Sequence, residues 1–535
     1  MKLGPRLRGG DGAKLLFAAV LVALVPAVAA AKTLRYASQT DPQTLDPHAA
    51  NLLATSRVTS NVYDSLVFWD RGWQLIPWLA ASWTQVSSTA WRFKLREGVK
   101  FHDGTPFTAD DVVFSVERAL SPTSQMRTAV QGVEMAKRVD DLTVDLILKE
   151  PNPALLRHLT QLRIMSRAWA MKNHAERPQD YKNKEDAYTS RNANGTGPFI
   201  VKEWSPDVRV VLVQNKDWWG HKAKYFESNL TEVVLLPVTS ASTRLAALIS
   251  GEVDLVIDPP TQDVARLRAS PQLKVMEGAE MRVQYLAFDL QRDELLYSSV
   301  KGKNPFKDIR VRQAVAHAID AEAIKTKVMR GMALPTGAIV TDLIAGYHPD
   351  ASKRLPYDRE RAKKLVAEAG YAAGFDVTLD CGNTQPATDI CQAVASMLSQ
   401  VGIRVKPNIV MQTAFFPKIE KHDTSFYLLS WGGGVTSDAL YTLNSLFHTV
   451  SHKGEGDFNM GRWSNAEMDR LVDVIKVDEN PARRNDEMRQ ALMLINRELP
   501  VVAIHQPLIP WAMRKNVDAW FAPTNTVYFY RVRIE

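Results

Sequence analysis

Cysteine is nearly absent from this 535-residue chain, which contains only Cys381 and Cys391. A structural zinc site needs a tetrahedron of cysteine and histidine ligands, and the sequence has no closely spaced cysteine pairs to supply them. Motifs of common catalytic sites are also missing, namely the GxxxxGK[ST] phosphate loop, the GxSxG nucleophile turn and HExxH. We therefore predict no metal site, no cofactor and no enzymatic activity.

One histidine pair has the spacing of metal ligands. His448 and His452 stand four residues apart in FHTVSH, so both could lie on one helical face. No glutamate follows the first histidine, so histidines that lie at the surface or only support neighbouring groups are the favoured interpretation.

Charge of one sign is not concentrated anywhere. The chain has 66 Lys and Arg against 59 Asp and Glu, a formal net charge of +7, with 45% hydrophobic and 23% charged residues. This excess is too small and too dispersed to predict nucleic-acid binding. The composition is that of a globular protein, and the length predicts at least two domains.

Apolar runs long enough to span a bilayer are missing too. The N-terminal apolar run, Leu15 to Val25, is shorter than the ~20 residues a membrane helix needs. It follows a basic start and precedes Pro26 and the small residues Ala27 to Ala31. We predict a cleavable signal peptide over residues 1–31, cut after Ala29 or Ala31, with a membrane anchor as the alternative. Because no cysteine stands there to carry a lipid, the mature protein is expected to be free in the periplasm.

An exported protein meets an oxidising compartment, in which its two cysteines can form a disulfide. Cys381 and Cys391 flank a short loop containing Pro386, and such a loop can bring two sulfur atoms together. A disulfide is the favoured interpretation, and two buried thiols are the alternative.

Strand-like and helical segments alternate along the chain, which predicts an α/β fold. The clearest examples are the strands at 208–213, 231–236, 253–257, 377–380 and 403–406 and the helices at 240–249, 359–369 and 390–400.

The segment from Ile76 to Leu120 is the most informative. Its alternating middle, its turn pairs Glu97-Gly98 and Asp103-Gly104, and Thr108 with Asp111 as a helix-capping pair predict strand, turn, strand, turn and helix.

The residue order in this segment resembles the signature of the peptide, nickel and oligopeptide class of solute-binding proteins that feed ABC importers. The shared pattern is LA.SW followed by F.LR.GV.FHDG.PFTA.DV.FS. Other segments resemble family landmarks in the family's order, and they are Thr40 to Pro47, Gly195 to Phe199, Asn215 to Gly220, Leu248 to Asp254, Asn304 to Asp320, Tyr357 to Gly370 and Asn459 to Asp469. The resemblance therefore covers essentially all of the chain beyond the N-terminal segment.

The resemblance implies a two-lobed periplasmic-binding-protein fold with the ligand cleft between the lobes. On that topology lobe I comprises 32–66, 195–284 and 505–535, an extra α+β subdomain of lobe I comprises 67–194, and lobe II comprises 285–504. The last segment, Val527 to Ile534, is expected to form an edge strand of lobe I. Hinge motion is expected to enclose the ligand.

Ligand-binding residues are expected at the end of an apolar strand that closes with Trp431. Glycines after it, Gly432 and Gly433 among them, would let backbone amides approach a ligand, and the resemblance implies that the aromatic residue packs on the ligand. Asn51 and Tyr285 correspond to further cleft positions. Core packing for the aromatic residues and a loop cap for Asn51 are the alternatives.

Two ionic anchors of the peptide binders are missing. Where those proteins place an aspartate for the peptide ammonium this chain has Gly434, and the stretch from Cys381 to Asp389 lacks their arginine for the peptide carboxylate. Asp438 and Arg462 are candidate replacements, although Asp438 could instead cap a helix and Arg462 could form an ordinary ion pair. Unmodified short peptides are expected to bind weakly unless these or other groups take over.

The predicted function is that of a monomeric receptor that binds a peptide or peptide-like polar solute and delivers it to ABC permease subunits. Alternatives are a receptor for a nickel chelate, an opine or an oligosaccharide, a periplasmic hydrolase, and a folding helper or scaffold with an exposed apolar surface.

Overall fold

The computed structural model describes residues 32–451 and 454–535. Within this part Lys32–Glu535 forms one unit. The predicted signal peptide and His452 lie outside the described residues. No helix in the described ranges has both the length and the apolar character needed to cross a membrane.

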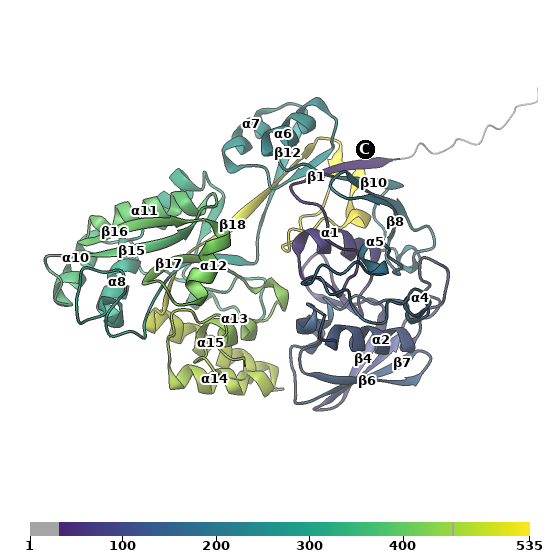
Figure 1. Ribbon diagram of the computed structural model, residues 1–535, viewed down its shortest axis with the longest axis horizontal. Helices are drawn as coiled ribbons and strands as arrows, with labels where there is room; N and C mark the ends of the chain where they lie inside the picture. Colours follow the sequence, from purple (N-terminus) through teal and green to yellow (C-terminus); the bar gives the residue numbers. More distant parts are fainter. Residues whose placement is uncertain (1–31, 452–453) are drawn as a thin grey trace, which may run out of the picture. The chain divides into compact units, whose positions relative to one another are not determined.

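A mixed 12-stranded sheet joins distant parts of the chain (Figure 1). Its strands, in spatial order, are β16 (Ile403–Val410), β15 (Phe375–Gly382), β17 (Phe426–Gly432), β13 (Arg282–Phe288), β18 (Val501–Arg514), β11 (Leu255–Ile257), β1 (Thr33–Ser38), β10 (Glu232–Pro237), β9 (Arg209–Gln214) and β8 (Phe199–Ser205). Two more strands, β12 (Leu273–Ala279) and β14 (Ala333–Pro335), also pair with β18.

Helices of the first half of the chain are α1 (Leu53–Val62), α2 (Ala109–Leu120), α3 (Leu155–Leu159), α4 (Arg167–Lys172), α5 (Tyr188–Arg191), α6 (Ala241–Ser250) and α7 (Val264–Ala269). Those of the second half are α8 (Ile309–Ala318), α9 (Ala321–Ala323), α10 (Arg359–Glu368), α11 (Ala387–Ser399), α12 (Gln412–Glu420), α13 (Ala439–Phe447), α14 (Ala466–Val477) and α15 (Pro481–Glu498). The alternation of strands and helices confirms the predicted α/β class.

Strand β18 connects the two halves of the sheet. Its first half pairs with β13 and β14, and its second half, from Leu508, pairs with β11 and β12. One hydrophobic core draws mainly on residues before 258 and after 510, and a second draws on residues 286–504. The predicted lobe boundaries at 284/285 and 504/505 fall inside β13 and β18, close to this changeover, and the division into lobes stays a prediction.

A separate four-stranded antiparallel sheet contains the signature segment. It has the order β4 (Ala80–Ser87), β5 (Ala90–Leu95), β7 (Thr143–Leu148) and β6 (Val133–Asp140). Helix α2 follows β5, and Thr108 N donates to Asp111 Oδ2 at 2.8 Å at its start. Asp111 Oδ1 also accepts from Arg167 N at 2.8 Å, which ties the later chain to this helix. The predicted strand, turn, strand, turn and helix are confirmed.

Several of the family landmarks meet at one buried carboxylate, Asp64, which is 3% exposed. The indoles of Trp78, Trp218 and Trp219 donate to it at 2.7, 3.2 and 2.9 Å, and Thr196 Oγ1 donates at 3.0 Å. Burial raises the pKa of Asp64, and the hydrogen bonds oppose that shift. Since a buried carboxylate without donors is costly, these landmarks serve the fold of this region rather than a ligand.

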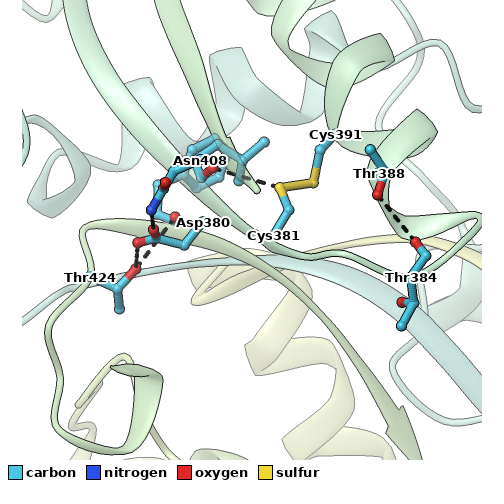
Figure 2. Close-up of a disulfide and its surroundings, with 9 residues drawn as sticks. Asp380, Cys381, Thr384, Thr388, Cys391, Asn408 and Thr424 are labelled. Atoms are coloured by element: carbon cyan, nitrogen blue, oxygen red, sulfur yellow. Dashed lines mark hydrogen bonds between the residues drawn. A yellow bond between two sulfur atoms is a disulfide. The ribbon is translucent and has the colours of Figure 1, made fainter. Parts of the chain in front are cut away.

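The predicted second α/β segment is also present, with α10, β15, α11 and β16 in that order. Cys381 at the end of β15 and Cys391 in α11 form a disulfide with a Cα to Cα distance of 6.7 Å (Figure 2). Beside it, Asp380 accepts from Thr424 Oγ1 at 2.7 Å and from Asn408 Nδ2 at 2.6 Å. The disulfide thus links the helix to a strand whose end is already fixed by the hydrogen bonds of the buried Asp380.

The expected edge strand from Val527 to Ile534 was wrong for most of its length. Only β20 (Arg533–Ile534) pairs, with the short β19 (Val517–Asp518). The backbone before it bonds to a side chain instead, because Asn61 Oδ1 accepts from Phe529 N and Asn61 Nδ2 donates to Val527 O, both at 2.9 Å. Residues 527–532 are all buried, so the alternating sequence reflects burial on all sides rather than a sheet edge. The remaining small sheet pairs β2 (Val67–Trp69) with β3 (Leu75–Pro77).

Candidate functional site

Trp431 lies near the end of β17 and is 9% exposed. Its indole Nε1 donates to Thr442 Oγ1 at 3.0 Å, and its ring stacks on Tyr441 with centroids 5.1 Å apart. The Phe458 ring packs against it at 5.2 Å. A solute approaching from the side of Tyr441 and Phe458 would meet these rings first, and direct contact with Trp431 stays a prediction.

The glycines after Trp431 have packing reasons of their own. A Cβ at Gly433 would stand 2.4 Å from Ile344 Cδ1, and one at Gly434 would stand 3.3 Å from Met281 Cβ. Gly433 N also donates to Met281 O at 3.0 Å. Gly432 is less confined, because its nearest atom would be Arg282 Nη2 at 3.7 Å. A side chain at Gly433 would therefore require the end of the Ile344 side chain to move, and ligand binding by Gly432 and Gly433 stays a prediction.

Asp438 is engaged within the chain. It caps α13, where its Oδ1 accepts from Leu440 N at 3.0 Å, and both of its oxygens accept from Arg484 of α15 at 2.9 Å. Burial opposes ionisation, but the guanidinium of Arg484 outweighs it and lowers the pKa of Asp438. Asp438 therefore has the helix-capping role that was its alternative. Its own carboxylate is not free for a solute ammonium, because both oxygens already accept hydrogen bonds from Arg484. Its role as an anchor stays a prediction.

Arg462 also has an internal partner. Its Nη2 donates to Asp289 Oδ2 at 3.1 Å, and the Asp289 side chain is only 2% exposed. Arg462 lines a different cavity, with His422 and Thr449 among its neighbours. The structure does not bring Arg462 into one pocket with Asp438.

The remaining predicted residues are also dispersed. Asn51 is exposed just before α1, and its backbone N donates to Gln125 Oε1 at 3.3 Å. Tyr285 is 3% exposed in β13 opposite Leu429 of β17, and burial raises the pKa of its phenol.

One cavity lies next to the Trp431 aromatic group. It has a volume of about 580 Å³ and is bounded by residues between Arg127 and His158 on one side and between Thr436 and Phe458, with Lys476, on the other. Tyr441 and Phe458 line it directly. This volume lies in the range of small-molecule sites. We name it the interdomain cavity, because its two walls come from the predicted subdomain and the predicted lobe II.

Hydrogen bonds also link the predicted subdomain to Ser437, which lies between the lining residues Thr436 and Asp438. Trp73 Nε1 donates to Ser437 Oγ at 3.4 Å, and Arg157 Nη1 donates to Ser437 O at 3.3 Å. A second cavity, of about 360 Å³, is lined by Arg157, Asp438 and Arg484 among others. Asp438 and its partner Arg484 thus form part of the wall of this second cavity, together with Arg157 of the predicted subdomain.

Sequence reasoning missed most residues of the interdomain cavity. The polar and aromatic side chains of interest are Arg127, Glu150, His158, Tyr441, Asn444, Asp457, Phe458 and Lys476. No local motif marks them, and the two walls are far apart in the sequence. Within the described residues no cluster of three or more His, Cys, Asp or Glu side chains could hold a metal ion.

Comparison with known proteins identifies the family. Residues 74–454 match the family described as Bacterial extracellular solute-binding proteins, family 5 Middle. The chain belongs to this family. The resemblance seen in the sequence is confirmed.

Relatives align over most of their length. Heme-binding protein A of Haemophilus influenzae is 26% identical, with 83% of this chain and 82% of the relative covered. Di/tripeptide-binding protein 2 of Pseudomonas aeruginosa is 26% identical, with 94% and 95% covered. These relatives of the solute-binding protein are named as binding proteins, not as enzymes.

A solved structure supports the fold. The ABC transporter-associated periplasmic binding protein DppA from Helicobacter pylori, in complex with peptide STSA, matches with a TM-score of 0.73 and 25% identity, covering 94% of this chain and 98% of that one. The fold class is therefore that of the periplasmic binding proteins, as predicted.

Proposed function

We propose that this protein is the periplasmic solute-binding component of an ABC importer and that it binds a peptide or peptide-like small polar solute. The observation that carries the proposal is the interdomain cavity of about 580 Å³, with polar and aromatic walls, in a chain of this family. Closure of two segments around a solute needs no covalent step. The closed form of the protein only has to bind the solute more tightly than the open form does.

The named relatives support the choice of a peptide. One is a di/tripeptide-binding protein, and the Helicobacter pylori structure contains a bound peptide. The relative named for heme supports a second candidate, a receptor for a non-peptide solute. Export with cleavage after Ala29 or Ala31, a monomeric state, delivery to permease subunits and the absence of turnover belong to the same proposal.

Thermal unfolding of the purified protein tests the proposal. A panel of di- and tripeptides, glutathione and heme is titrated, and a cognate solute is expected to raise Tm in a saturable, concentration-dependent manner. Chromatography of each solute after incubation should show no conversion. A solute that is consumed, or a panel and periplasmic extract that leave Tm unchanged, would contradict the receptor function.

A further inference from the structure

The interdomain cavity contains two buried polar atoms without a hydrogen-bond partner, His158 Nδ1 and Asn444 Oδ1. The His158 residue is 5% exposed, and burial lowers the pKa of its ring to about 4. The imidazole is therefore neutral near pH 7 and presents one acceptor nitrogen, while the amide oxygen of Asn444 can only accept. A buried acceptor without a donor is costly, so a donor in the cavity would relieve both atoms.

The charges around the cavity favour a cationic donor. Asp438 is neutralised by Arg484, and Glu455 accepts from Lys476 at 2.9 Å. Among the described residues Glu150 and Asp457 have no ion-pair partner, and both are exposed at the cavity. The remaining described cation of the lining is Arg127, whose Nε donates to Ser121 O at 3.2 Å. Among the described residues, the cavity lining thus has two carboxylates without an ion-pair partner, Glu150 and Asp457, against one such cation, Arg127.

Aromatic rings add to this preference. Tyr441 and Phe458 line the cavity, and Phe458 is 47% exposed. Since the face of an aromatic ring attracts a cation, these rings give a charged solute group an apolar wall that does not repel it.

We propose that the interdomain cavity binds a primary ammonium group of the solute. The ammonium has several N–H donors, so it can bond to Asn444 Oδ1 and the His158 ring while Asp457 and Glu150 balance its charge. These groups replace the aspartate that peptide binders have where this chain has Gly434. The inference rests on the proposed peptide or peptide-like solute and specifies the chemistry of one of its ends.

Calorimetry with trialanine and N-acetyl-trialanine tests the inference on the mature protein. Acetylation removes the ammonium and keeps the rest of the peptide, so affinity should fall about tenfold or more. Asp457→Asn and Asn444→Leu should weaken trialanine binding by a similar factor and leave the already weak acetylated peptide unchanged. Asn444→Asp keeps an acceptor and should retain trialanine binding, which a merely structural role of Asn444 would not predict.

Glu176→Gln is the matched control, because Glu176 is an exposed carboxylate that does not line the cavity. It should bind both peptides as the unmodified protein does. Equal affinity for the two peptides would overturn the ammonium site and leave the receptor function intact. If neither peptide binds at millimolar concentration, both the peptide proposal and this inference are overturned.

Discussion

At the scale of single residues, Trp431 combines a buried position with a place beside the interdomain cavity. Its ring supports Tyr441 and Phe458, which line the cavity, and its indole is fixed by Thr442. The packed rings of Trp431, Tyr441 and Phe458 can therefore present a single apolar surface to a solute.

Trp431→Ala should weaken binding of the cognate solute by about 2 kcal/mol or more, because the truncation removes the ring against which Tyr441 and Phe458 of the cavity wall pack. Calorimetry measures the change. Trp204→Ala is the control, since the Trp204 indole also has one hydrogen bond, to Asp41 Oδ2 at 2.9 Å, but Trp204 lines a different cavity and does not support the Tyr441 and Phe458 wall. Unchanged affinity of Trp431→Ala would place the binding site elsewhere.

Buried histidines predict how stability depends on pH. Burial lowers the pKa of His48, His102, His158 and His505 to about 4 in each case. Between pH ~6.5 and pH ~4 the unfolded chain binds protons at these positions and the folded chain does not, so the free energy of unfolding must fall as pH falls through this window. Urea unfolding at pH 7 and pH 5 should give a lower value at pH 5. An equal or higher value at pH 5 would contradict the buried, neutral state of these rings.

At the scale of elements, the disulfide joins β15 to α11. A short loop of this kind is expected to stabilise the fold by about 2 to 3 kcal/mol through the unfolded state. The unreduced protein, unfolded in denaturant, should show no reactive thiol, and the reduced protein should show two and unfold at lower denaturant concentration. Two reactive thiols before reduction would refute the link.

Elements whose signals are local were predictable. The capping pair Thr108 and Asp111 starts α2 where expected, and β15, α11 and β16 follow their hydrophobic patterns within a few residues. The segment from Val527 failed because an alternating pattern does not reveal what the backbone bonds to. Asn61, more than 460 residues away, takes the place of a neighbouring strand.

At the scale of the whole molecule, the site could not be predicted in the same way. The end of an apolar strand marks Trp431 in the sequence, and its ring contacts Tyr441 and Phe458 of the cavity lining. Asn444, His158 and Asp457 line the same cavity only because chain segments far apart in the sequence meet there. The sequence makes Asp438 and Arg462 candidate anchors, with a helix cap and an ion pair as the alternatives. The structure gives each a partner, Arg484 and Asp289, that no local pattern predicts.

The sheet also predicts where the molecule bends. Strand β18 changes partners near Leu508, and the chain passes from β12 to β13 at Glu280 and Met281. Because few stretches of the chain cross between the two halves of the sheet at these positions, we expect the hinge there. Small-angle scattering should show a smaller radius of gyration at saturating solute than without solute. An unchanged radius would argue against hinge closure.

The central claim is that this protein carries a peptide or peptide-like solute. It is tested most directly by purifying the protein from periplasm, denaturing it and identifying the released small molecule by mass spectrometry. We predict a molecule with a free primary amine and amide bonds, present in near-equimolar amount and able to raise Tm when added back. A stoichiometric solute without an amine or amide would contradict the account.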